Sequence, residues 1–285
     1  KDVKCNGKRI AEQTMVYAGD VIEMFLYEDK VKEFQSEVRI EQVPITFEIV
    51  YEDDNILIVN KPCGLLLHED DKEKKNTLAN QVLAYLYSKK EYDPSQSQGF
   101  VPGPVHRLDR NTSGLVIFGK NFTSLKNLNE MVRLRHCIEK QYVTVVKGYM
   151  QGDGHLVGYM KKDEEKQKCY MVSKETKGAL TMETKYHVLK SNSLYSYVEV
   201  TLVTGRTHQI RLHLSSISHS VIGDRKYGDF EVNRIMKEKY HLSHQLLHAY
   251  RITFKRCIGN LQYLQDKSFE ASVSGKFSQI VQDLF

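Results

Sequence analysis

The chain has 285 residues, with 41 Lys and Arg against 36 Asp and Glu, which gives a formal net charge of +5. Its hydrophobic content of 41% and aromatic content of 10% exclude a disordered chain. No apolar run approaches the roughly 18 residues that a membrane span requires, so we expect a soluble protein without a membrane partner. The small positive charge permits a nucleic-acid partner, and only the distribution of that charge can favour one.

The cysteines are five in number and scattered, and none belongs to a C-x-x-C pair. This pattern favours reduced thiols in a cytoplasmic protein over disulfides or a structural zinc site. No apolar segment follows Lys1, so no signal peptide is expected. The cysteines are Cys5, Cys63, Cys137, Cys169 and Cys257.

The first 43 residues differ in composition from the remainder of the chain. Residues 1–26 are predicted to form a small β unit, because Asn6-Gly7 and Gly19-Asp20 are turn signals beside short apolar segments. Residues 27–43 are rich in Glu and Lys and are interpreted as a linker. The chain is therefore predicted to consist of this unit, the linker and one larger domain over 44–285.

Strand and helix patterns mix irregularly in the larger domain. Two short strands are expected within 45–62, separated by an Asp-Asp-Asn turn at 53–55. The charge run at 161–168 is typical of a solvated hairpin tip. Helices are expected at 77–87, 124–136 and 207–216, and strands at 116–120, 141–148, 181–189 and 194–205. This irregular alternation predicts an α+β fold built on a mostly antiparallel sheet.

Residues 101–120 carry the first dense group of polar side chains. Asp109 lies between Arg107 and Arg110, and nearby positive charge would keep its carboxylate ionised. An ionised carboxylate can act as a nucleophile, a general base or a metal ligand. The alternative is a surface turn with an ordinary Arg–Asp pair, worth about 0–1 kcal/mol.

Residues 204–228 carry the second group. In a helix over 207–216, His208 and Arg211 share one face, which could direct a guanidinium at an anion. Three histidines at 208, 213 and 219 lack zinc-ligand spacing and have no cysteine or carboxylate partner at such spacing. We therefore expect no metal site.

The third group follows the strand at 140–148, where Tyr142 shares a face with Thr144 and Val146. A buried core tyrosine is the alternative interpretation.

The three regions concentrate positive charge. Residues 105–120, 133–147 and 205–226 have net charges of +2, +3 and +3, and the remainder of the chain has a net charge of −3. This concentration favours a polyanionic substrate.

Five motifs together resemble the RluA-type pseudouridine synthases. HRLDRNTSG at 106–114 resembles the family signature that contains the catalytic Asp. VNKPCGLLLH at 59–68, KQYVTVVKG at 140–148, GRTHQIRLHL with IGDRKYG at 205–228, and LLHAYRITF at 246–254 resemble its other motifs in order. Thr144 in place of Ala, and Ser218-His-Ser-Val in place of Gly-His-Pro-Ile, depart from the family pattern.

The resemblance implies the family's catalytic fold, with a mixed, mostly antiparallel sheet flanked by helices, and isomerisation of uridine to pseudouridine in RNA. Asp109 would be the nucleophile or base at the sugar of a flipped nucleotide. Whether it attacks C1′ or assists abstraction at C2′ stays open. Arg211 would pair with Asp109, and Tyr142 would stack on the uracil.

The resemblance further implies a set of substrate contacts and no cofactor or metal. Arg107 would fill the gap left by the flipped nucleotide, and the other contacts would position the RNA or bind its phosphates. The partner would be RNA, with ribosomal RNA favoured, transfer RNA as the alternative, and an idle RNA-binding protein as a rival interpretation. The contact residues are His106, Arg107, Arg110, Thr112, Arg206 and His208.

Residues 1–26 resemble the second half of the alpha-L RNA-binding fold, through the patterns V-x-C-N-G-K and G-D-V-I. This resemblance favours the family branch that acts on large-subunit (23S) ribosomal RNA. The chain is expected to be a monomer.

Overall fold

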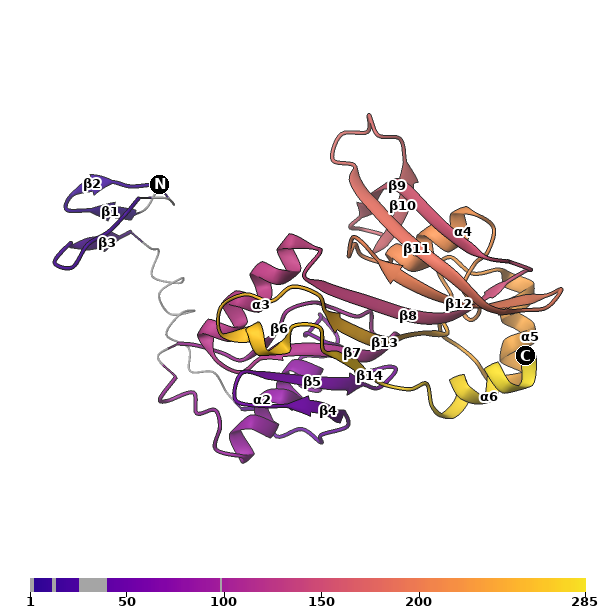
Figure 1. The fold of residues 1–285 in the computed structure, drawn as a ribbon, viewed down its shortest axis with the longest axis horizontal. Helices are drawn as coiled ribbons and strands as arrows, with labels where there is room; N and C mark the ends of the chain where they lie inside the picture. Colours follow the sequence, from indigo (N-terminus) through magenta and orange to yellow (C-terminus); the bar gives the residue numbers. More distant parts are fainter. Residues whose placement is uncertain (1–2, 12–13, 26–39, 98) are drawn as a thin grey trace.

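The computed structural model describes residues 3–11, 14–25, 40–97 and 99–285 (Figure 1). The N-terminal residues form a three-stranded antiparallel sheet in the order β2-β1-β3. Asn6 and Gly7 take positive φ values of 51° and 76° in the turn between β1 and β2, as the turn signal predicted. Most of the predicted linker lies outside the described residues, so it stays a prediction. The strands are β1 (Val3–Cys5), β2 (Lys8–Arg9) and β3 (Ile22–Met24).

The larger domain is built on an 11-stranded sheet with the main order β10-β9-β11-β12-β8-β13-β7-β5-β4. β14 pairs with β13, and β6 pairs with β7. Among the described strands, β13 and β7 form the only parallel pair, so the predicted α+β, mostly antiparallel fold is confirmed. The strands are β4 (Glu48–Glu52), β5 (Ile56–Lys61), β6 (Gly103–Pro104), β7 (Ser113–Gly119), β8 (Ile138–Lys147), β9 (Asp153–Asp163), β10 (Lys168–Val172), β11 (Leu180–Ser191), β12 (Tyr195–Leu202), β13 (Leu247–Phe254) and β14 (Ser268–Glu270).

Helices lie against both faces of this sheet (Figure 1). Apolar residues of α2 and α4 share one core cluster with β5, β7, β8 and β12. On the other face of the sheet, residues of α3 and η1 pack against β5 and β7. Residues of α5 and α6 pack on the same face, against β8. The helices are α2 (Leu78–Ser88), α3 (Phe122–Leu134), α4 (Gln209–Ser216), α5 (Phe230–Tyr240), α6 (Gly275–Leu284) and the 3₁₀ helix η1 (Gly259–Leu264).

The predicted helices form with small shifts at their ends, and local contacts explain the shifts. α3 begins at Phe122 because the Asn121 side chain accepts the Ser124 N–H at 2.9 Å. α4 begins at Gln209, two residues later than predicted, because His208 has left-handed backbone angles. The charge run near 161–168 forms the β9–β10 hairpin end, as expected.

The loop that carries Asp109 is followed by a close approach of two backbones. Gly114, in β7, has a φ of 113°, and a Cβ atom there would lie 2.2 Å from the Ala249 carbonyl oxygen of β13. Only glycine fits this combination of angle and contact. The parallel β7–β13 pair thus fixes where the 106–112 segment leaves the sheet. No helix among the described residues is long and apolar enough to cross a membrane.

Candidate active site

A cavity of about 430 Å³ lies mainly between four parts of the chain: the segment before β7, the end of α3, strand β8, and the β12–α4 connection. It brings together eight of the nine residues that the sequence singled out. The exception is Arg110, which instead pairs with Asp70 at 3.2 Å, both side chains being 44% exposed. The eight are His106, Arg107, Asp109, Thr112, Tyr142, Arg206, His208 and Arg211.

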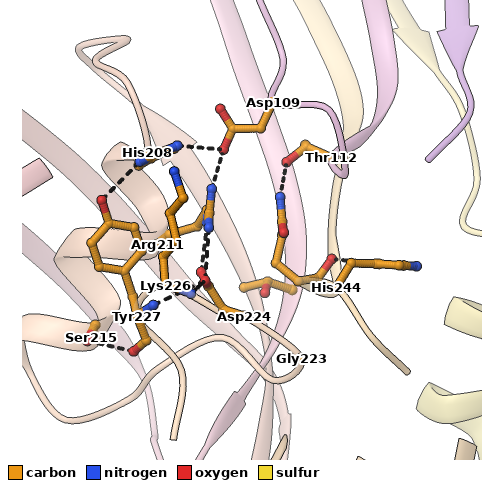
Figure 2. A network of polar contacts seen from close by, with 12 residues as sticks. Asp109, Thr112, His208, Arg211, Ser215, Gly223, Asp224, Lys226, Tyr227 and His244 are labelled. Carbon is orange, nitrogen blue, oxygen red and sulfur yellow. Dashed lines mark hydrogen bonds and ion pairs between the residues drawn. The ribbon is translucent and has the colours of Figure 1, made fainter. Parts of the chain in front are cut away.

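Arg211 joins two carboxylates at the base of this site (Figure 2). Its Nη1 donates to Asp109 Oδ2 at 2.7 Å. Its Nε and Nη2 donate to Asp224 Oδ2 and Oδ1 at 2.6 and 2.9 Å. Fork-like pairing of this kind fixes the guanidinium plane as well as its charge. The partner of the Asp109 carboxylate is therefore Arg211, and not the adjacent Arg107 or Arg110.

Burial and charge act in opposite directions on this cluster. Burial alone would lower the pKa of Arg211, but hydrogen bonds and attraction from Asp224, and then from Asp109, raise it. For Asp224, burial raises the pKa, and the Arg211 contact together with the Lys226 and Tyr227 N–H groups lowers it overall. Both groups therefore stay charged, and Arg211 is locked in place beside Asp109.

Asp224 is the main residue of this site that the sequence interpretation did not single out. Its carboxylate and that of Asp109 contact one guanidinium. Asp224 is fully buried, so its carboxylate cannot reach a substrate directly. A signal existed, because an acidic residue directly after the apolar Val221-Ile222-Gly223 needs a buried partner.

Tyr142 lies on β8 and lines the cavity while being only 5% exposed. Burial, with the negative charge of Asp109, raises its pKa, so its hydroxyl stays protonated at neutral pH. Two residues further on, the Thr144 hydroxyl donates to the Leu246 carbonyl at 2.8 Å. Thr144, a departure from the family pattern, thus satisfies its buried hydroxyl within the sheet.

The other cavity residues are held by contacts of their own. His106 Nε2 accepts the Ile117 N–H at 3.2 Å, and burial, then repulsion from Lys140, lowers the pKa of His106 to about 3. His106 is therefore neutral and does not add a positive charge to the cavity. Thr112 Oγ1 accepts from the Gln245 amide at 3.4 Å. Arg206 Nε donates to the Thr181 carbonyl at 3.2 Å.

The cavity lining is strongly cationic. Asp109 is its only acidic residue within the described chain, and it faces six Lys and Arg residues. These cations come from the three segments in which the sequence concentrates positive charge. A lining of this kind attracts an anion and leaves one carboxylate to act on it. The cations are Arg107, Arg133, Arg135, Lys140, Arg206 and Arg211.

Sequence reasoning also missed the role of Lys61, which is fully buried beneath the Asp109 segment. Its Nζ donates to the carbonyls of Pro62, Leu65 and Arg110 at 3.0, 2.8 and 2.9 Å. Burial lowers its pKa to about 8. The N-K-P motif thus ties its own turn to the backbone that follows Asp109.

Comparison with known proteins identifies the family of this chain. The sequence model of the RNA pseudouridylate synthase family matches residues 55–216. An uncharacterized RNA pseudouridine synthase of Aquifex aeolicus is 40% identical over 76% of this chain and 67% of that protein. Ribosomal large subunit pseudouridine synthase D of Buchnera aphidicola is 33% identical over 72% of this chain and 64% of that protein. The matches thus span about two thirds of these relatives.

A solved structure agrees at the level of the fold. Human RNA pseudouridylate synthase domain containing 4 has a TM-score of 0.63 at 21% identity, with 83% of this chain and 92% of that chain covered. The family model covers more than half of the chain and includes the Asp109 and Arg211 motifs. The chain therefore belongs to the RluA-type family of RNA pseudouridine synthases.

Proposed function

We propose that this chain isomerises specific uridines of 23S ribosomal RNA to pseudouridine, with Asp109 as the group that acts at the sugar of a flipped nucleotide. The main support is that the cavity lining has one carboxylate among several cations. Arg211 holds this carboxylate, that of Asp109, through a hydrogen bond of 2.7 Å. The relative from Buchnera aphidicola, named for the ribosomal large subunit, supports ribosomal RNA as the substrate. Transfer RNA is the alternative.

In the proposed reaction the N1–C1′ bond breaks, the uracil turns, and a C5–C1′ bond forms. The C5 proton leaves and N1 gains a proton, so no oxidant or reductant is needed. Asp109 would either attack C1′ or remove a proton at C2′, and both routes need an ionised carboxylate beside the sugar. The glycosidic bond is inaccessible in a stacked helix, which is why the base must enter the cavity.

Tyr142 and Arg211 would serve this reaction in different ways. Tyr142 stays protonated, so it offers an aromatic face and a hydroxyl donor to the uracil. Arg211 stays charged and holds Asp109 Oδ2, so the carboxylate approaches the sugar in one orientation. The surrounding cations would bind the RNA phosphates.

The test is Asp109→Asn assayed on 23S ribosomal RNA and on transfer RNA. We expect no pseudouridine from the variant and an RNA Kd within a few-fold of wild type. The exposed Asp71 supplies the matched control, and Asp71→Asn should keep full turnover. Turnover by Asp109→Asn would remove the assigned role of Asp109, and an inactive wild type that still binds RNA would support the idle-protein alternative.

Pseudouridine mapping by carbodiimide-stop sequencing identifies the substrate. Total RNA from a deletion strain should lose one or a few stops in 23S ribosomal RNA, and expression of the wild-type chain should restore them. Loss of stops only in transfer RNA would support the alternative substrate.

A further inference from the structure

His208 stands between the proposed catalytic carboxylate and a buried tyrosine (Figure 2). It directly precedes α4 and has a φ of 56°, in the left-handed region. Its side chain is 11% exposed and lines the cavity. Its Nδ1 lies 2.9 Å from Tyr227 Oη, and its Nε2 lies 3.9 Å from Asp109 Oδ2. The two ring nitrogens therefore face chemically different partners.

The contact between Tyr227 and His208 determines which ring nitrogen of His208 carries the proton. The Cys169 N–H donates to Tyr227 Oη at 2.8 Å, so that oxygen already accepts one hydrogen bond. In the part of the chain that the structure describes, His208 Nδ1 is the only group placed to accept the hydroxyl hydrogen of Tyr227. Burial raises the pKa of Tyr227, so this hydrogen is present at neutral pH. Tyr227 Oη–H thus donates to Nδ1, which must be unprotonated.

The charge state of His208 leads to the same conclusion. Burial, with repulsion from Arg211 and Lys226, lowers the pKa of His208 to about 4, although attraction from Asp109 and Asp224 opposes the shift. The imidazole is therefore neutral, and with Nδ1 as an acceptor its proton lies on Nε2. The opposite tautomer would leave the Tyr227 hydrogen without an acceptor and would turn a lone pair towards a carboxylate.

The proton on Nε2 of His208 points towards the Asp109 carboxylate. Nε2 of His208 and Nη1 of Arg211 both face Oδ2 of Asp109, at 3.9 and 2.7 Å. Figure 2 shows both contacts on one oxygen and none on the other. A separation of 3.9 Å is longer than a hydrogen bond, and such catalytic contacts often shorten when substrate binds.

We propose that His208 is a positioning residue for Asp109. Its imidazole is fixed by Tyr227 as the neutral Nε2–H tautomer, and it steers Oδ2 together with Arg211 so that Oδ1 faces the sugar of the target nucleotide. The effect of His208 on catalysis by Asp109 rests on the proposed function. The tautomer of His208 is a property of the protein without RNA and can be tested separately. This assignment differs from a direct RNA contact, the role that the sequence analysis gave to His208.

The tautomer is measured by ¹⁵N NMR of the protein with labelled histidine and without RNA. We expect His208 to show a protonated Nε2 and an unprotonated Nδ1 throughout pH 5.5 to 8. Tyr227→Phe should weaken this preference, because Nδ1 then loses its donor while the Asp109 carboxylate still faces Nε2. A protonated Nδ1, or titration of His208 near the ordinary histidine pKa of about 6.5, would overturn the proposal.

Two amide variants test the positioning role. Gln at 208 places an N–H near the position of Nε2, whereas Asn places one near Nδ1 and tolerates left-handed backbone angles better. We expect His208→Asn to lower kcat by about 100-fold, as for a misplaced catalytic group, and His208→Gln to keep most of the wild-type kcat. The RNA Kd should change less than twofold in both. If His208 mattered only for the left-handed backbone angles at this position, His208→Asn would keep a higher kcat than His208→Gln.

The outcomes separate this inference from the proposed function. If the wild-type chain forms no pseudouridine, the proposed function fails and the NMR result still reports the tautomer. If turnover depends on Asp109 but His208→Asn matches wild type in kcat, only the positioning role fails. A weaker RNA Kd at unchanged kcat would make His208 an RNA contact and would overturn the proposal.

Discussion

Asp109 and Asp224 contact the same guanidinium from different environments: Asp109 is 21% exposed and lines the cavity, whereas Asp224 is fully buried. Arg211 therefore carries two negative partners, of which only one can reach a substrate. The buried partner compensates the charge of Arg211, and the exposed one keeps a free oxygen. This arrangement lets the protein hold the Asp109 carboxylate in a fixed orientation beside a cationic surface.

The first prediction concerns Asp224→Asn. Removing one partner of a buried ion pair costs about 3–5 kcal/mol when the remaining charge loses its compensation, and Arg211 would keep only the partly exposed Asp109 as a partner. We expect a loss of that order in the free energy of unfolding, and a kcat at least tenfold lower because Arg211 no longer has a fixed plane. Denaturant unfolding and single-turnover kinetics measure the two effects.

The control for Asp224→Asn is the exposed Arg–Asp pair of the same chain. Asp70 pairs with Arg110 at 3.2 Å with both side chains 44% exposed. Asp70→Asn should therefore cost less than about 1 kcal/mol and leave kcat unchanged. Equal effects of the two substitutions would contradict the view that burial makes the Asp224 contact important.

The second prediction concerns Lys61→Met, which keeps the apolar stem and removes the ammonium group. Three carbonyls would lose their donor, and that of the buried Leu65 would be left unsatisfied at a cost of about 1–3 kcal/mol. One of them belongs to Arg110, directly after Asp109, so kcat should fall as well. The exposed Lys174 offers the control, and Lys174→Met should change neither quantity. A stable and active Lys61→Met protein would show that the Asp109 segment is held by other contacts.

The third prediction concerns the cationic lining. Arg135 and Lys140 line the cavity, and neither forms an ion pair within the described chain. Each phosphate contact that is removed should make log Kd for RNA less dependent on log salt by about one unit. Titrations of Arg135→Gln and Lys140→Gln against RNA at several salt concentrations measure these slopes. Lys190→Gln, outside the cavity lining, should leave the slope at its wild-type value, and unchanged slopes for the cavity variants would place the phosphates elsewhere.

Much of the fold follows from local signals in the sequence. Apolar periodicity predicts α2, and the turn signal at Asn6-Gly7 predicts the β1–β2 hairpin. The segments that concentrate positive charge also predict the cavity lining, because charge counts do not depend on the exact course of the chain. These features are set by neighbouring residues, so they can be recognised without a structure.

The contacts that the sequence did not predict are all long-range. Lys61 meets the Arg110 carbonyl across 49 positions, and Arg211 meets Asp109 and Asp224 across 102 and 13 positions. Of these contacts, the family resemblance predicted only the pairing of Arg211 with Asp109. The tautomer of His208 depends on the Cys169 N–H, which reaches the site through β10. Such contacts depend on sheet order and register, which periodicity does not encode.

The last prediction concerns acid stability and His106. The unfolded chain protonates a histidine with a pKa of about 6.5, whereas burial lowers the pKa of His106 to about 3 in the folded protein. Between these values the unfolded state binds more protons, so the free energy of unfolding falls as the pH decreases from about 6.5. Each such histidine contributes at most about 1.4 kcal/mol per pH unit.

The pKa of His208 shifts in the same direction, as do those of His68, His213 and His248, so several histidines contribute to the slope between pH 6.5 and 5. Buried carboxylates such as Asp224, whose pKa is lowered, act mainly at more acidic pH and leave this window to the histidines. Denaturant unfolding at pH 7, 6 and 5 should therefore show a shallower decline for His106→Gln than for wild type. The exposed His136 is the matched control, and His136→Gln should retain the wild-type decline. Parallel curves for wild type and His106→Gln would mean that His106 is charged in the folded protein, and it would then add a seventh cation to the cavity.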